Sequence, residues 1–175
     1  MLEPLTLATR ADLPAIWQLY SDVCEHQAAD TYSPQWTLGI YPAEEDFLDR
    51  IDAGEMMLGF DQGRLVGALV LTREEDPEYV GIPWPSGATE DEVSVIHLLA
   101  VHPDARGQRL GAQLVREAIR IAREWGKRAI HLDVMLGNLA ASRIYLAEGF
   151  KHIGNSEVFY EDTGTVELEM YELVL

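Results

Sequence analysis

Two short stretches of this sequence carry residue types that could bind a phosphate group and place a proton donor close to it. The first, residues 106–111 (RGQRLG), follows an apolar run and opens an amphipathic helix. A Gly/Arg turn of this kind points backbone N–H groups at one spot, where they and the helix dipole favour an anion. In the second stretch Asn138 can cap a helix, and Tyr145 follows about two helical turns later. Together they predict a site for a phosphate-bearing carrier molecule, with a proton donor close to the reactive end of that molecule.

Three other ionisable side chains lie on or beside apolar runs. His97 stands alone on such a run, where a histidine is more often a satisfied core residue than a catalyst, yet its side chain titrates near neutral pH. Glu92 precedes the same run and is the alternative base, although a solvated charge is the ordinary role in so acidic a stretch. Asp133 is flanked by apolar residues, so a buried carboxylate there needs a partner. The partner could be the ammonium group of a bound substrate, Arg143 or backbone N–H groups. A pairing within the protein is more common for such an aspartate than binding of a substrate, so a structural role is favoured for Asp133.

Alternating strands and helices would position these side chains. Apolar periodicity and turn residues predict strands at 5–7, 56–60, 65–71, 93–101, 129–134, 150–156 and 166–175. Helices are predicted to start at Asp12, to run from Pro42 to Gly54, and to cover 112–125 and 138–148. The run 93–101 is nearly all apolar, which is typical of a central strand buried on both faces. This order predicts a mixed α/β fold with a central sheet of about six to seven strands and about four helices.

Two irregular stretches, residues 28–41 and 74–90, carry large aromatic side chains. These are Tyr32, Trp36, Tyr41, Tyr79 and Trp84. Irregular segments with large aromatics are common in ligand sites, and aromatic faces beside acidic residues suit an organic cation. The candidate substrate-binding residues are therefore Trp36, Tyr41, Trp84 and Asp133. The alternative is that these rings only anchor the two stretches to the sheet.

The length and composition favour one globular domain covering residues 1–175. No long apolar run predicts a membrane-spanning helix, and the N-terminus does not resemble a signal peptide. The single cysteine, Cys24, excludes an intramolecular disulfide and fits a reducing cytosol, so we expect a cytoplasmic protein. We expect Cys24 to be a small buried hydrophobic residue rather than a nucleophile.

The charge of the chain bears on its partners. A net charge of −17 argues against a nucleic acid, because binding a polyanion depends on Lys and Arg. It mildly favours a cationic small molecule, although acidic surfaces also simply keep proteins soluble. The bases cluster in and after the Gly/Arg turn: Arg106, Arg109, Arg116, Arg120, Arg123, Lys127 and Arg128. A local positive region of this kind is what an anionic ligand would need.

The order and spacing of the motifs resemble the acetyl-CoA-binding core of the GNAT N-acetyltransferase superfamily. The residues that carry the resemblance are Leu99, Ala100, Val101 and Pro103, then residues 106–111, then Asn138, Ala141, Tyr145, Gly149 and Phe150. They cover about a third of the chain. One residue departs from the family pattern, because Arg109 stands where the family usually has glycine. Its backbone N–H survives the change, while its side chain either swings outward or adds a charge to the pyrophosphate.

The resemblance implies a GNAT-like fold that takes acetyl-CoA as donor substrate and holds no metal. It implies that backbone amides of Leu99 to Val101 meet the pantetheine, and that those of Gly107 to Ala112 meet the pyrophosphate. The implied cofactor-binding residues are Leu99, Ala100, Val101, Arg106, Gly107, Gln108, Arg109, Leu110, Gly111, Ala112, Asn138 and Tyr145. Asn138 would contact coenzyme A and also cap its helix.

Acetyl transfer from a thioester to an amine needs a base and an acid. Deprotonating an amine with a pKa near 10 at pH 7 costs roughly 4 kcal/mol, and the leaving thiolate has a pKa of about 8.5. Tyr145 is the candidate acid; the alternative is core packing beside Ala141. His97 is the first candidate base, since arylalkylamine N-acetyltransferases have a similar strand with a histidine thought to relay the proton, and Glu92 is the second. His102 also matches that strand but is expected to face solvent.

These observations predict an acetyl-CoA-dependent N-acetyltransferase that acts on a primary amine by direct attack in a ternary complex. The acceptor is expected to be a small molecule, possibly cationic, with neither nucleic acid nor membrane as partner. A catalytically weak acyl-CoA-binding module of the same fold is the alternative. The acceptor's identity and the size of the acyl group stay open. A homodimer formed through the extended C-terminal segment is a further hypothesis.

Overall fold

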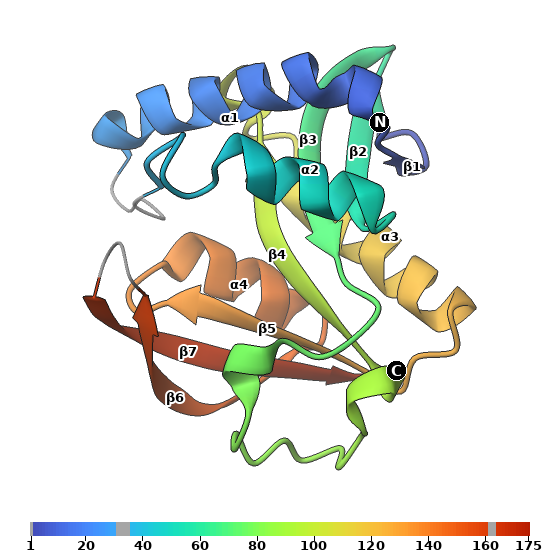
Figure 1. Ribbon diagram of the computed structural model, residues 1–175, viewed down its shortest axis with the longest axis vertical. Helices are drawn as coiled ribbons and strands as arrows, with labels where there is room; N and C mark the ends of the chain where they lie inside the picture. Colours follow the sequence, from blue (N-terminus) through green and yellow to red (C-terminus); the bar gives the residue numbers. More distant parts are fainter. Residues whose placement is uncertain (1, 31–35, 161–163) are drawn as a thin grey trace.

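The chain forms a seven-stranded sheet in the computed structural model, which describes residues 2–30, 36–160 and 164–175 (Figure 1). The strand order within these residues is β1-β2-β3-β4-β5-β7-β6. The strands are β1 (Thr6–Leu7), β2 (Met56–Asp61), β3 (Arg64–Leu71), β4 (Val93–Val101), β5 (Ala129–Met135), β6 (Lys151–Tyr160) and β7 (Gly164–Val174). β4 and β5 are parallel, while the other neighbouring strands are antiparallel.

Four α-helices of the described residues cover the two faces of the sheet. They are α1 (Leu13–His26), α2 (Glu44–Asp52), α3 (Leu110–Glu124) and α4 (Leu139–Ala147). In Figure 1, α1 and α2 cross in front of the upper strands, whereas α3 and α4 lie behind the sheet. The predicted mixed α/β class, with its strand and helix numbers, is confirmed.

Strand β4 changes the side of the sheet that its residues face partway along its length. Ile96 and Val101 pack in the core with α3, whereas Leu98 and Ala100 pack in the core with α1 and α2. Strict alternation would put Ile96 and Ala100 on the same face. Leu98 has a φ of +51°, and the pairing of β3 with β4 shifts register beside it. This bulge turns His97 and Leu98 toward the same side of the sheet.

Strands β4 and β5 pair only along their first residues. The last pair is Val95 with His131, after which the two strands separate, as Figure 1 shows. β5 continues to pair with β7, and β4 continues to pair with β3 as far as Val101. The edge of β4 that faces β5 therefore has no partner strand from residue 97 onward, although the Leu98 carbonyl accepts the Tyr20 hydroxyl. We call the space between the two diverging strands the β4–β5 gap.

Several element boundaries differ from the predicted ones. β6 runs to Tyr160 rather than ending near Ser156, and α2 starts at Glu44 with Pro42 outside it. The C-terminal strand β7 lies between β5 and β6, so both of its edges are taken. The hypothesis that this segment pairs with a second copy is wrong for that reason, because β6 forms the edge of the sheet. Among the helices of the described ranges, none combines the length and apolar composition that crossing a bilayer requires.

Candidate active site

The turn before α3 has the backbone conformation of an anion cradle. Gly107 and Arg109 have φ values of +81° and +58°, and α3 starts at the next residue, Leu110. Such left-handed residues turn successive amides toward one side of the chain. An added Cβ at Gly107 would meet no atom within 4 Å, so the space over the turn is open.

The amides of this turn have no acceptor within the described part of the chain. Arg106 N–H donates to the Pro103 carbonyl, and Gln113 N–H donates to the Arg109 carbonyl. The six N–H groups between them, from Gly107 to Ala112, donate to no protein atom. Unpaired amides at a helix start need a partner, and an anion can supply it.

Gly111 also has a packing role. A Cβ at Gly111 would lie 3.0 Å from Ile144 Cδ1 on α4, which is a close contact. Glycine at this position therefore lets α3 approach α4. Any bulky substitution of Gly111 would disturb this packing as well as the cradle.

The positive region predicted around the turn is largely neutralised. Arg106 pairs with Asp30 at 2.7 Å, and Arg116 pairs with Glu148 at 2.7 Å. Arg120 and Arg128 also pair with acids, at 2.6 Å to Glu124 and 2.7 Å to Glu92 respectively. Arg109 is exposed, and its guanidinium makes no ion pair with any described residue. The usual family glycine is thus replaced by an arginine whose charge is free to meet a phosphate.

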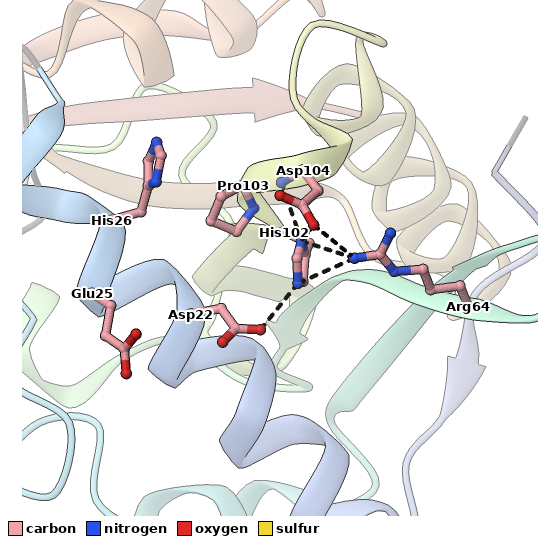
Figure 2. Close-up of a pocket in the computed structure, with 7 residues that line it drawn as sticks. All are labelled: Asp22, Glu25, His26, Arg64, His102, Pro103 and Asp104. Atoms are coloured by element: carbon pink, nitrogen blue, oxygen red, sulfur yellow. Dashed lines mark hydrogen bonds and ion pairs between the residues drawn. The ribbon is translucent and has the colours of Figure 1, made fainter.

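A groove beside the cradle contains His102 (Figure 2). Its lining consists of Asp22, Glu25, His26, Arg64, His102, Pro103 and Asp104. The His102 side chain is only 15% exposed, and its Nε2 lies 3.0 Å from Asp22 Oδ2 on α1. Its Nδ1 accepts the Asp104 N–H at 3.2 Å. His102 thus keeps only a small exposed surface in the groove, and the residue ties α1 to the start of the cradle.

Asn138 and Tyr145 sit at the two ends of α4. The Asn138 Oδ1 accepts the Ala141 N–H at 3.1 Å, so the predicted helix cap is present. The Tyr145 ring is buried against Phe150 and Tyr171. Its hydroxyl has no hydrogen bond to a described residue. Burial and the nearby Asp133 carboxylate raise the pKa of this hydroxyl well above its usual value, so it keeps its proton at neutral pH.

His97 lies at the start of the β4–β5 gap and has a carboxylate partner. Its Nε2 is 2.9 Å from Asp76 Oδ2, and both side chains are mostly buried. Burial alone would raise the pKa of the Asp76 carboxyl, but the contacts with His97 and with the Glu78 N–H lower it further than burial raises it. Asp76 is therefore ionised at neutral pH and can orient the imidazole as in other base–carboxylate pairs.

Asp133 lies on β5 across the gap from His97. Its Oδ2 accepts the Tyr79 hydroxyl at 2.5 Å, and its Oδ1 has no protein donor among the described residues. Burial is the main cause that raises the pKa of Asp133, while His97 and Tyr79 act in the opposite direction. Arg143 is not its partner. The carboxylate can thus receive a donor from a bound molecule.

The aromatic candidates occupy different positions. Tyr41 is 41% exposed, and partial burial followed by the charges of Asp133 and Asp46 raises its pKa. Trp36 exchanges two backbone hydrogen bonds with the Gln27 side chain and packs on Tyr20, which makes it an anchor to α1. Trp84 stacks on His131 with ring centroids 3.6 Å apart. Tyr32 lies outside the described residues.

Glu92 is placed away from the gap. It precedes β4, at the end where β4 and β5 are still paired, and its Oε2 binds Arg128 at 2.7 Å. The same carboxylate accepts the Thr89 N–H. These contacts and its distance from the gap favour the ordinary role of a surface charge for Glu92.

Two residues of this site escaped the sequence analysis in part or entirely. Asp76 was not singled out, and Tyr79 was considered only as an aromatic ring. Asp76 belongs to an acidic run, and the one local signal is its place before Pro77, which marks a turn. Among the described residues, no group of three or more His, Cys, Asp or Glu side chains could hold a metal ion.

Comparison with known proteins identifies the family. The model of the acetyltransferase (GNAT) family matches residues 14–150. The matched residues make up more than half of the chain, which therefore belongs to this family.

Individual relatives are more distant. A mycothiol acetyltransferase of Stackebrandtia nassauensis is 33% identical over 86 residues, which are 48% of this chain and 28% of that protein. An uncharacterised N-acetyltransferase of Methanocaldococcus jannaschii is 29% identical over 73% of this chain and 67% of its own length. This chain thus spans less than a third of the first relative.

Solved structures share the fold. A GNAT-family acetyltransferase from Streptococcus agalactiae superposes with a TM-score of 0.81 at 19% identity, covering 99% of this chain and 95% of that one. A putative acetyltransferase from Salmonella typhimurium, solved with acetyl-CoA, has a TM-score of 0.68 at 20% identity, covering 100% and 94%.

Proposed function

We propose that the protein transfers an acetyl group from acetyl-CoA to a primary amine by direct attack in the β4–β5 gap. The observation that carries this proposal is the row of six unpaired amides from Gly107 to Ala112 at the start of α3. They suit a diphosphate, and a neighbour of the same fold was solved with acetyl-CoA. The unpaired edge of β4 up to Val101 suits the amide groups of a pantetheine arm.

The chain's own residues can perform the proton transfers. Asp133 would hold the acceptor ammonium through Oδ1, and His97, oriented by Asp76, would take the proton from the amine. Tyr145 reaches the gap from the α4 side and would donate its proton to the departing thiolate. The thioester supplies the activated acyl group, so no covalent intermediate on the protein is required.

The acceptor in this proposal is a small molecule that carries one amine. Asp133 and Asp76 give the gap a negative charge that attracts a cation, and Tyr41 is the aromatic side chain that we propose as a further contact of that cation. We include a single domain and a cytosolic location in the proposal, supported by the continuous sheet and the single cysteine. The homodimer also stays a proposal, but the strand available for it is the edge strand β6 rather than the C-terminal β7, since that edge of β6 has no partner strand among the described residues.

Charge reversal at the cradle tests the donor site. We expect Arg109→Glu to weaken acetyl-CoA binding at least about tenfold in calorimetry, because it places a negative charge beside the diphosphate. Arg123→Glu is the matched control, since Arg123 is exposed on the same helix and makes no ion pair with a described residue. Equal affinities for the two variants would show that the diphosphate binds elsewhere.

Amine-dependent thiol release tests the reaction. Purified protein with acetyl-CoA and a panel of monoamines, diamines and amino acids should release coenzyme A faster with some amines than without any. Tight acetyl-CoA binding with no amine-dependent release would favour the acyl-CoA-binding module. That alternative is favoured by one observation, the non-glycine residue at position 109 of the cradle.

A further inference from the structure

A second histidine on the same face of the sheet lies behind the proposed base. His131 is completely buried on β5, in the last residue pair before β4 and β5 separate. Its Nδ1 lies 2.6 Å from Glu75 Oε2, and its Nε2 lies 3.1 Å from Glu172 Oε1. No part of the proposed function uses this triad of Glu75, His131 and Glu172.

The triad holds the imidazole of His131 from both edges and from one face. Each ring nitrogen has a glutamate oxygen within hydrogen-bond distance, so both nitrogens have partners although the ring is buried. Trp84 covers the ring face to face, with centroids 3.6 Å apart and planes inclined by 9°. These contacts leave the ring one position.

Glu75 connects this triad directly to the carboxylate that holds His97. While its Oε2 meets His131, its Oε1 accepts the N–H of the next residue, Asp76, at 3.2 Å. Asp76 in turn meets His97 at 2.9 Å. The chain of contacts therefore runs from His131 through one side chain and one peptide group to the proposed base.

The same contacts hold the whole segment between β3 and β4 on the sheet. The Ser86 N–H donates to Glu172 at 3.1 Å, and the Tyr79 hydroxyl donates to Asp133 at 2.5 Å. The Glu75 N–H donates to the Glu90 carbonyl. Apolar side chains of the segment also pack onto the sheet, since Tyr79, Ile82 and Trp84 join a core cluster with residues of β4, β5 and β7. Polar and apolar contacts together fix its place.

We propose that His131 and Glu75 are positioning residues for the acetyl transfer. They fix the backbone at Asp76 so that its carboxylate orients His97 at the β4–β5 gap. Neither is a catalytic residue, since His131 has no exposed surface and lies under Trp84. This inference rests on the proposed function for its kinetic consequence, but the geometry at His97 can be measured without any reaction.

Glu75→Ala and Glu74→Ala form the matched pair that tests this inference. Both remove one negative charge from adjacent positions, but the exposed Glu74 side chain has no partner among the described residues. Nuclear magnetic resonance of the imidazole groups, with His97 assigned through His97→Gln, reports the base directly. We expect Glu75→Ala to shift the His97 signals and their pH titration, whereas Glu74→Ala leaves both as in the wild type.

The kinetic test uses the same variants with the amine that gives the fastest release of coenzyme A from the wild type. Glu75→Ala should lower kcat by about tenfold, because small displacements of a catalytic group are costly, with KM for acetyl-CoA nearly unchanged. It should also move the acid limb of the pH profile. Glu75→Gln keeps an acceptor for only one of the two donors, so its values should fall between those of the wild type and Glu75→Ala.

Each outcome decides the inference. Identical His97 signals in Glu75→Ala and Glu74→Ala would overturn it. If Glu75→Ala does not fold, Glu75→Gln decides: His97 signals and a pH profile equal to those of the wild type would reduce Glu75 to structural support. Shifted His97 signals in a protein that acetylates no amine would contradict the proposed function and leave the positioning intact.

Discussion

Asp76 Oδ2 lies 2.9 Å from His97 Nε2, which joins an irregular segment to the central strand of the sheet. His97 alone would be an ordinary histidine on an apolar strand. The carboxylate places beside it a charge that compensates the proton it would take from an amine. This pair is the centre of the proposed chemistry, and the predictions below examine the groups around it.

Asp76→Asn should lower kcat at least about tenfold at neutral pH, because an amide orients the imidazole less firmly and does not compensate its charge. The acid limb of the profile of kcat/KM should move to lower pH, since a neighbouring carboxylate favours the protonated ring. Steady-state rates between pH 5 and pH 9 measure both effects. Glu74→Gln is the control, and a profile for Asp76→Asn that matches this control would remove Asp76 from the mechanism.

Tyr145→Phe should lower kcat about a hundredfold, while acetyl-CoA affinity and thermal stability change little. The phenyl ring keeps the contacts with Phe150 and Tyr171, and only the unpaired hydroxyl is lost. Calorimetry, thermal unfolding and amine-dependent thiol release measure the three quantities. A variant as fast as the wild type would leave the thiolate to be protonated by solvent.

Asp133→Asn should raise Tm at neutral pH. Burial raises the pKa of Asp133 above its value in the unfolded chain, so its contribution to stability is present at low pH and is lost as the pH rises through the folded pKa. The amide carries no charge to desolvate, and its oxygen can still accept the Tyr79 hydroxyl. The gain in Tm should therefore grow from pH 4 to pH 7.

Asp76→Asn supplies the opposite case for the same measurement. The pKa of Asp76 is lowered, so its contribution to stability is present above the unfolded pKa and is lost as the pH falls through the folded value. This variant should lower Tm at pH 7 and approach the wild type in acid. Parallel pH dependences for Asp133→Asn and Asp76→Asn would contradict both assignments.

Arg109→Gly should stabilise the fold and weaken acetyl-CoA binding at once. A non-glycine residue at a φ of +58° is strained by roughly 1 kcal/mol, which glycine relieves, although the lost guanidinium no longer meets the phosphates. Gln62→Gly is the control, because Gln62 has a φ of +51° in the turn between β2 and β3 and contributes no amide to the cradle. It should raise Tm similarly without changing acetyl-CoA affinity, as thermal unfolding and calorimetry would show.

Local patterns in the sequence were sufficient for most of the fold. The apolar run 93–101 predicted β4 with its observed bounds, and the periodicity after the Gly/Arg turn predicted α3 to within two residues at its start. β6 extends further than predicted and continues past Ser156 through Glu157 to the buried Val158, as a partner of β7 along its whole length. The bulge at Leu98 has no sequence signal, since leucine rarely adopts a positive φ.

The candidate site divides in the same way. The cradle and the Asn138 cap are local features, so a motif can reveal them. The contacts of Asp76 with His97 and of Tyr79 with Asp133 join segments that are distant along the chain, and only the packing of the 74–92 segment onto the sheet creates them. Asp76 and Glu92 are both acids in acidic runs, and nothing local separates the one at the gap from the one on the surface.

The reversed backbone at Leu98 has a consequence for how two molecules could share one site. The bulge leaves His97 on the same face as Leu98, which packs with α1 and α2, whereas Tyr145 packs in the core with α3 on the opposite face. Acetyl-CoA and the amine would then enter the β4–β5 gap from opposite faces of the sheet. Neither has to depart before its counterpart arrives, and the order of their addition is left to their concentrations.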